Sequence, residues 1–187
     1  GGSTGYVVFN WLEKPPLNDA YQNAAPIGEG VTTGTLYLAT LDGSSNAGGA
    51  NADVWYAYTA TAMGTLHLNT CGSQDYSGLD TVLSAHVNTG VVGTTANEID
   101  ANDDYPFGSD PTICDPEPGA HNLDSGMAFV VAAGDVILIR VSEYSGPEAA
   151  FRLNVNLDTD SDDDGVPDAI DAFPFDPTES VDTDGDG

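Results

Sequence analysis

The C-terminal part of the chain carries aspartates at alternate positions, followed by a glycine. The run reads DTDSDDDGVPDAID from Asp158 to Asp171 and resumes as DTDGDG at Asp182. Carboxylates at this spacing repel one another unless a positive ion lies among them. A hard cation with several oxygen ligands, calcium above all, meets that requirement. We therefore predict that residues 158–187 bind calcium.

The spacing matches the ligand positions of a calcium loop, with Gly165 at the turn and the carbonyl of Val166 directly after it. The predicted ligands are Asp160, Asp162, Asp164, Val166, Asp168 and Asp171, and a second, incomplete repeat would supply Asp182, Asp184 and Asp186. A solvated acidic tail is the alternative, since charge runs usually are solvated. The regular spacing and the position of the glycine favour calcium.

Composition limits the partners of this chain. It has 30 acidic residues and three basic ones, for a net charge of −27. Such a surface repels nucleic-acid phosphates and anionic lipid, so we expect neither a nucleic-acid partner nor membrane insertion. The chain shows no initiator Met and no signal peptide, and we expect a mature or trimmed product.

Two cysteines, Cys71 and Cys114, are present. A calcium loop of this kind implies an extracellular setting, in which paired cysteines oxidise. We expect a disulfide between them. Two buried free thiols are the alternative.

Short runs rich in β-branched and aromatic residues, separated by Gly, Asn, Ser and Asp clusters, predict an all-β fold. An apolar strand covers GYVVFNWLEK and ends at Pro15-Pro16, and residues 18–24 form a turn or one helical turn. The other predicted strands are 33–41, 53–60, 64–70, 80–87, 98–103, 127–133, 135–144 and 149–157. Alternation places Trp55 on one face of its strand and Tyr56 and Tyr58 on the other, which is typical of a core tryptophan.

Catalysis is not indicated. The three histidines, His67, His86 and His121, show no metal-binding spacing, and we expect His67 and His86 to face solvent. No GxSxG motif occurs. Acidic pairs are so frequent that no pair stands out as a glycosidase dyad. We expect no enzymatic activity.

Several segments resemble the bacterial pre-peptidase C-terminal domain over about residues 18–157. They are NDAYQNA, NADVWYAYTA, GTLHLNTCGS, LDTVLSAHV, IDANDD and MAFVVAAGDVILIRVSEYSGPEAAFRLNV. The chain differs at Tyr21, where many members have cysteine, and in a long insertion at 105–125. Separately, the aspartate run is similar to thrombospondin type 3 repeats. Both resemblances imply an extracellular location and neither implies catalysis.

The apolar N-terminal run and the two resemblances together divide the chain into three predicted segments. Residues 1–14 would be an N-terminal strand, in its own sheet or donated to a neighbour. Residues 15–157 would be a jelly-roll-like antiparallel β-sandwich, and residues 158–187 a calcium-binding tail.

A second calcium site also follows from the resemblance, because the LDT strand and the NDD loop lie near each other in such sandwiches. Its residues would be Asp80, Asn102, Asp103 and Asp104, with Asp53 a weaker candidate. Alternatively, Asp80 caps a turn and the NDD loop is solvated.

These observations favour a secreted or cell-surface, non-catalytic, calcium-binding structural module. We expect it to be a subunit of a bacterial cell-surface filament, appendage or adhesive layer that self-associates head to tail through the N-terminal strand and the C-terminal tail. The first alternative is an accessory secretion or substrate-binding domain of a secreted hydrolase. The second is a lectin-like binder that uses calcium and Trp55.

Overall fold

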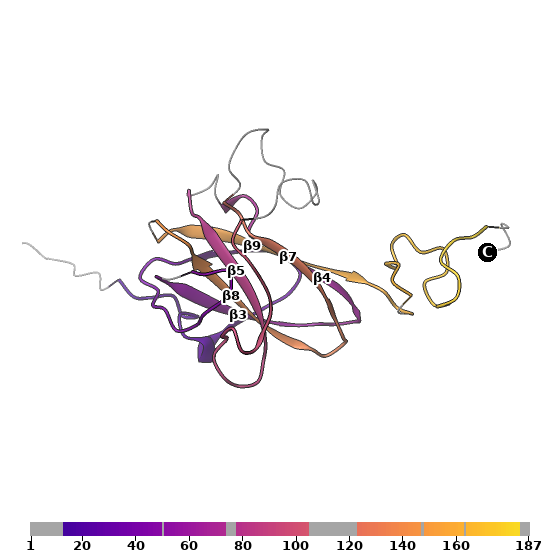
Figure 1. Cartoon of the computed structure of the whole chain (residues 1–187), viewed down its shortest axis with the longest axis horizontal. Coiled ribbons are helices and arrows are strands. Elements are labelled where there is room, and N and C mark those ends of the chain that lie inside the picture. The colour runs from indigo at the N-terminus through magenta and orange to yellow at the C-terminus, as the bar shows by residue number, and fades with distance from the viewer. Residues whose placement is uncertain are drawn as a thin grey trace, which may run out of the picture.

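The computed structural model describes residues 13–49, 51–73, 78–104, 123–146, 148–162 and 164–183. Two sheets pack against each other in this part of the chain (Figure 1). The first has the order β1-β3-β8-β5-β6 and the second β2-β9-β4-β7. The strands are β1 (Ala25–Ile27), β2 (Gly30–Thr35), β3 (Asp53–Thr59), β4 (Gly64–Asn69), β5 (Thr81–Val87), β6 (Glu98–Asn102), β7 (Gly126–Val131), β8 (Val136–Glu143) and β9 (Ala150–Thr159). The predicted all-β sandwich is confirmed.

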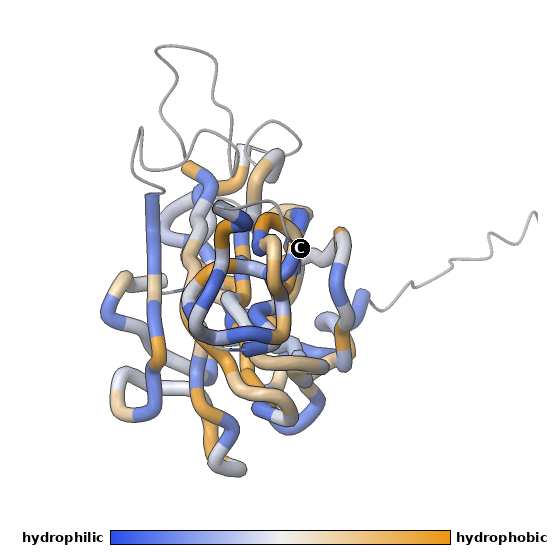
Figure 2. The backbone as a smooth tube through the Cα atoms, turned by 90° about the vertical axis from the view of Figure 1, so that its right-hand side faces the viewer, coloured by the Kyte–Doolittle hydropathy of each residue, from blue (hydrophilic) through white to orange (hydrophobic). Residues whose placement is uncertain are grey.

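Alternation along the strands builds the core between the sheets. In β4, Leu66 and Leu68 are fully buried, while Thr65, His67 and Asn69 at the alternate positions are half-buried. Tyr56 and Tyr58 of β3 reach the same core from the opposite sheet. Figure 2 shows hydrophobic (orange) and hydrophilic (blue) residues interspersed along the backbone. Burial of these apolar side chains is the main stabilising contribution to such a fold.

Seven of the predicted strands lie within two residues of the observed ones, but the predicted strand 33–41 is displaced. β2 begins at Gly30 and ends at Thr35. The chain then turns, with the Ala39 amide donating to the Leu36 carbonyl (2.9 Å) and Leu38 at a φ of 61°. A left-handed residue cannot continue a strand, so the apolar run after Thr35 leaves the sheet.

Two short elements precede β2. The predicted turn at 18–24 contains the 3₁₀ helix η1 (Tyr21–Asn23). β1 was not predicted; it pairs in parallel with β3 and contains Pro26, which suits an edge position because proline donates no ladder hydrogen bond. In the described residues, no helix is long and apolar enough to span a bilayer. The predicted N-terminal strand falls mainly on residues 1–12, outside the described part of the chain.

Loops cover the outer face of the five-stranded sheet and bury Trp55 and His86 completely. A Cβ at Gly43 would lie 2.4 Å from the Trp55 ring, and one at Gly93 would lie 2.6 Å from the same ring. Both loops therefore need glycine to approach the indole. Trp55 is buried as predicted, but it lies beneath loops and outside the core between the sheets, whereas the solvent-facing prediction for His86 is wrong. The alternation of β5 was recognised, but nothing in it indicated that a loop covers the outer face.

Candidate calcium sites

The aspartate run that begins at Asp158, called the aspartate ladder below, starts where β9 ends, and its first residues are hydrogen-bonded to the sandwich. The Asp160 amide donates to the Met63 carbonyl, in the turn between β3 and β4 (3.3 Å). The Asp168 amide returns to donate to the Thr159 carbonyl (2.8 Å). Residues 159–168 thus form a loop closed on the end of β9. The tail, yellow in Figure 1, continues away from the sandwich.

Three carboxylates of this loop converge. Asp160, Asp162 and Asp164 each offer an oxygen, and these oxygens lie within 4.8 Å of one another. Gly165 has a φ of +92°, and its amide donates to Asp160 Oδ2 (3.0 Å). The turn therefore occurs at the glycine, as the spacing predicted, and it gathers the preceding carboxylates. Three oxygens at this separation are a ligand set for a hard cation.

Two carboxylate oxygens, Oδ2 of Asp162 in this loop and Oδ2 of Asp171 just after it, are buried without a partner in the described residues. Desolvation and the negative charges of Asp164, Asp171 and Asp160 raise the pKa of Asp162. A buried anionic oxygen without a partner is costly, and a cation would satisfy it.

Asp168, which was predicted to be a ligand, has another role. Its Oδ1 accepts the Ser161 amide (2.7 Å), and its Oδ2 accepts the hydroxyls of Ser161 (2.8 Å) and Thr159 (2.9 Å). These hydrogen bonds lower the pKa of Asp168 and close the loop. Asp168 is not in the converging group. The ligand role of the Val166 carbonyl stays a prediction.

Of the second repeat, Asp182 is described and does not belong to the converging group. Asp184 and Asp186 lie outside the described residues.

A second carboxylate group lies at the end of the five-stranded sheet. Asp80 precedes β5 and Asp103 and Asp104 follow β6, and these strands are antiparallel neighbours. One oxygen from each of the three side chains lies within 4.8 Å of the others. The fully buried hydroxyl of Ser125 contacts the carbonyls of Thr81 and Asp103 and so ties both segments together. The sheet therefore brings these carboxylates to one place, as the resemblance implied.

This second group is strongly anionic and partly desolvated. Burial, followed by the charges of Asp104 and Asp80, raises the pKa of Asp103 to about 6. Burial, followed by the charges of Asp104 and Glu143, raises the pKa of Asp80. Within the described residues, the Oδ1 atoms of Asp80 and Asp103 are buried and make no hydrogen bond. A divalent cation would compensate the buried negative charge of Asp80 and of Asp103.

Asn102, the fourth predicted residue of this group, positions the loop. Its Oδ1 accepts the Gly126 amide (2.9 Å), and its Nδ2 donates to the Asp104 carbonyl (3.1 Å). The side chain thereby fastens the β6 end to β7 and fixes the backbone that carries the two aspartates.

Asp53, the weaker calcium candidate, is instead part of a buried ion pair. Arg140 Nε lies 2.7 Å from Asp53 Oδ2, and both side chains are fully buried. Asp53 Oδ2 also accepts the Gly43 amide (3.0 Å). Sequence reasoning missed this pair. A signal was present, because Arg140 is the single basic residue in the apolar run DVILIRVSEY.

Glu143 was also missed, and nothing in the strand pattern singled it out. It is 1% exposed, and its Oε2 has no partner in the part of the chain that the structure describes. Burial raises its pKa.

The two described histidines, His67 and His86, do not form an accessible site. His86 Nε2 lies 2.9 Å from the Ser84 hydroxyl, and its Nδ1 lies 3.3 Å from the Thr94 carbonyl. The side chains of His86 and Ser84 are fully buried, and burial lowers the pKa of His86. His67 pairs with Asp158 across neighbouring strands (3.1 Å). His121 and Cys114 lie outside the described residues, so the bond from Cys71 to Cys114 stays a prediction.

No protein-family model matches the sequence, and no curated relative matches it. Among solved structures, the pre-peptidase C-terminal domain of a collagenase from Bacillus anthracis is similar at 13% identity and a TM-score of 0.44, covering 71% of this chain and 94% of that one. CorA, a surface-associated copper-binding protein of Methylomicrobium album BG8, is similar at 10% identity and a TM-score of 0.40, covering 72% and 97%. Scores of this size assign neither a family nor a function.

Proposed function

We propose that this chain is an extracellular, non-catalytic structural module whose C-terminal tail is ordered by calcium. One observation carries the proposal: three carboxylates converge beside a glycine turn, and Asp162 and Asp171 each bury an oxygen without a partner in the described residues. Calcium accepts many oxygen ligands in a flexible geometry, whereas magnesium demands a near-ideal octahedron and retains its waters. An irregular loop rich in carboxylates suits calcium better.

Calcium would convert the tail into a stiff connector. Residues 158–183 contain few apolar side chains, and Ile170, Phe175 and Val181 are exposed. Such a segment has little hydrophobic burial to offset the entropy of ordering. Binding energy from the ion supplies that stabilisation, since ligand binding and ordering are coupled in sites of this kind.

A second ion would bind at Asp80, Asp103 and Asp104. The two unpartnered oxygens and the raised pKa of Asp103 support it. Calcium there would tie the β5–β6 end to the segment around Ser125. We rank this site below the tail because only the tail also has the sequence spacing of a calcium loop.

The extracellular location rests on the same chemistry. Calcium sites of extracellular modules work at about 10⁻⁴–10⁻³ M, concentrations not found in cytosol. A surface with a net charge of −27 resists nonspecific association with nucleic acids and anionic lipids. The predicted disulfide fits this setting, and non-reducing peptide mapping would test it. Within this role, self-association would make the chain a subunit of a surface filament or layer.

Limited proteolysis with and without chelator tests the calcium-ordered tail. With millimolar calcium, residues 158–183 should resist cleavage, and excess EGTA should expose them while the sandwich stays intact. Asp162→Asn should remove the protection. Asp176→Asn is the matched control, because the Asp176 carboxylate accepts the amide and hydroxyl of Thr178 instead (3.1 and 2.6 Å). Identical cleavage of the wild-type tail in calcium and in EGTA would contradict the proposal.

A further inference from the structure

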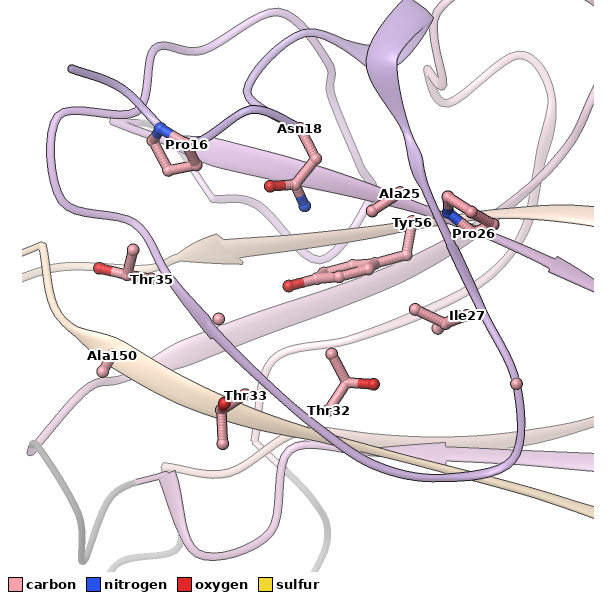
Figure 3. Close-up of a pocket in the computed structure, with 12 residues that line it drawn as sticks. Pro16, Asn18, Ala25, Pro26, Ile27, Thr32, Thr33, Thr35, Tyr56 and Ala150 are labelled. Carbon is pink, nitrogen blue, oxygen red and sulfur yellow. The ribbon is translucent and has the colours of Figure 1, made fainter.

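A groove opens along one side of the sandwich, where the edge strands β1 and β2 of the two sheets face each other (Figure 3). Its volume is about 750 Å³, and its lining includes Asn18, Ile27, Thr32 and Tyr56. In the described residues, β1 is hydrogen-bonded to β3 alone and β2 to β9 alone. Each strand therefore leaves one backbone edge facing the groove side, and such edges can pair with another strand.

The inward side of β2 is built from small residues. Gly30, Thr32 and Gly34 are paired with three β9 residues whose side chains are in the core, so they face inward too. At Gly34 the space is filled, since a Cβ there would lie 2.3 Å from the Tyr56 hydroxyl. At Gly30 and Gly28, by contrast, a Cβ would meet no described atom within 4 Å. Gly28 and Gly30 are exposed, so this end of the groove is open to solvent and has room for added side chains.

We propose that this groove accepts residues 6–12 of a second copy of the chain as an added strand. That segment, YVVFNWL, carries no charge, has high β propensity and lies outside the described residues. Seven extended residues span about 23 Å, close to the length of about 20 Å that six residues of β2 cover. An added strand gains main-chain hydrogen bonds from an open edge and packs alternate side chains into the space beneath it.

The connection to the sandwich favours a second copy over the chain's own segment. The Tyr37 hydroxyl donates to Glu13 Oε2 (2.6 Å), which anchors residue 13 beyond the end of β2. Lys14 and Pro15 each precede a proline and are held extended. Because Pro16 already lines the groove, the preceding segment would have to reverse within these extended residues to enter it. The contacts and prolines of residues 13–16 therefore favour entry of residues 6–12 from a second copy.

This inference rests on the self-association part of the proposed function and names its acceptor surface, but it does not involve calcium. The test is light scattering with size-exclusion chromatography on the full chain, in calcium and in EGTA. Gly28→Trp blocks the groove at a position with open space, and Phe9→Asp disables the donor. Val31→Trp is the control, because Val31 is 66% exposed on the outward face of β2.

The wild type and Val31→Trp should assemble to multiples of 19.3 kDa under both conditions, and each of the other two variants alone should stay at 19.3 kDa. Mixed together, Gly28→Trp and Phe9→Asp should form a one-to-one complex of twice that mass, because each supplies what the other lacks. Circular dichroism checks folding, and Pro26→Arg at an exposed lining residue replaces Gly28→Trp if that variant misfolds.

A wild type that stays monomeric at several hundred micromolar overturns the inference. So does a mixture of the two variants that forms no complex, or a Val31→Trp chain that fails to assemble. Assembly that disappears in EGTA would assign the contact to the calcium-binding tail instead. Loss of calcium binding with assembly intact would refute the calcium proposal alone.

Discussion

Replacing Arg140 by methionine should destabilise the sandwich strongly, although Arg140 lies in neither calcium site. The substitution keeps the length of the side chain and removes its charge. Four hydrogen bonds are lost: to Asp53 Oδ2 (2.7 Å), to the Gly49 carbonyl (3.0 Å), to the Ser142 hydroxyl (3.2 Å) and to the Gly48 carbonyl (3.4 Å).

The expected loss of unfolding free energy follows from the groups that remain around Asp53 after the substitution. The Asp53 carboxylate stays fully buried, with neutral donors in place of a cation: the amides of Gly43 (3.0 Å) and Asp42 (3.3 Å) and the indole of Trp55 (3.1 Å). Breaking a buried ion pair by removing one partner costs about 3–5 kcal/mol. That is a large fraction of the free energy of unfolding of an ordinary domain, about 5–15 kcal/mol.

Urea unfolding followed by circular dichroism measures this loss at neutral pH. Arg152→Met is the matched control, because it makes the same chemical change at an exposed arginine of β9 and should cost less than about 1 kcal/mol. Asp53→Asn should also destabilise, and the double variant should lose less than the sum of the two single losses, since the pair acts as a unit. A loss for Arg140→Met no larger than that of the control would refute the reasoning.

Further predictions concern the ladder, the second site and the groove. Asp162→Asn should weaken calcium binding by the tail about tenfold or more in calorimetric titration, because affinity depends on ligand charge, while Asp176→Asn should not. Asp103 has a pKa of about 6, above the unfolded value, so its charged form destabilises the fold above pH 6. In chelator, the melting temperature of the wild type, measured relative to that of Asp103→Asn, should therefore rise as the pH falls from 7 to 5. Saturating calcium should abolish that trend. A difference in melting temperature that does not change with pH in chelator would contradict the prediction. Gly34→Ala should cost about 1–3 kcal/mol through overpacking against the core rings, whereas Gly28→Ala should be nearly neutral; equal losses would contradict the groove geometry.

β4 and β9 were predictable because one face of each is buried and the other is not, whereas β3, β5 and β8 are buried on both faces and were recognised from their β-branched and aromatic residues. β4 shows this most clearly, with Leu66 and Leu68 inside. β2 was misplaced because its inward residues, Gly30, Thr32 and Gly34, carry no apolar signal, while the apolar residues that follow lie in a turn. Pairing of a three-residue edge strand such as β1 depends on the neighbouring β3, which local sequence does not encode.

The two carboxylate groups differ in how far the sequence determined them. Asp160, Asp162 and Asp164 are close in sequence, so a single glycine turn gathers them and the spacing was sufficient. Asp80 and Asp103 lie next to the ends of two different strands, β5 and β6, and their proximity required knowledge of the fold. The sequence spacing also predicted Asp168 as a ligand. Spacing alone could not show that the hydroxyls of Thr159 and Ser161 donate to the same carboxylate.

The groove and the ladder are connected by one strand. β9 runs from Ala150, which lines the groove, to Thr159, where the calcium loop begins, and it pairs with β2 along the groove and with β4 beside the ladder. A strand held in the groove would therefore be linked to the tail through continuous main-chain hydrogen bonds. Tension between neighbouring copies would load these bonds together along the strand. Under the proposed function, calcium in the tail would order the residues after Thr159, which pair with no strand in the described part of the chain.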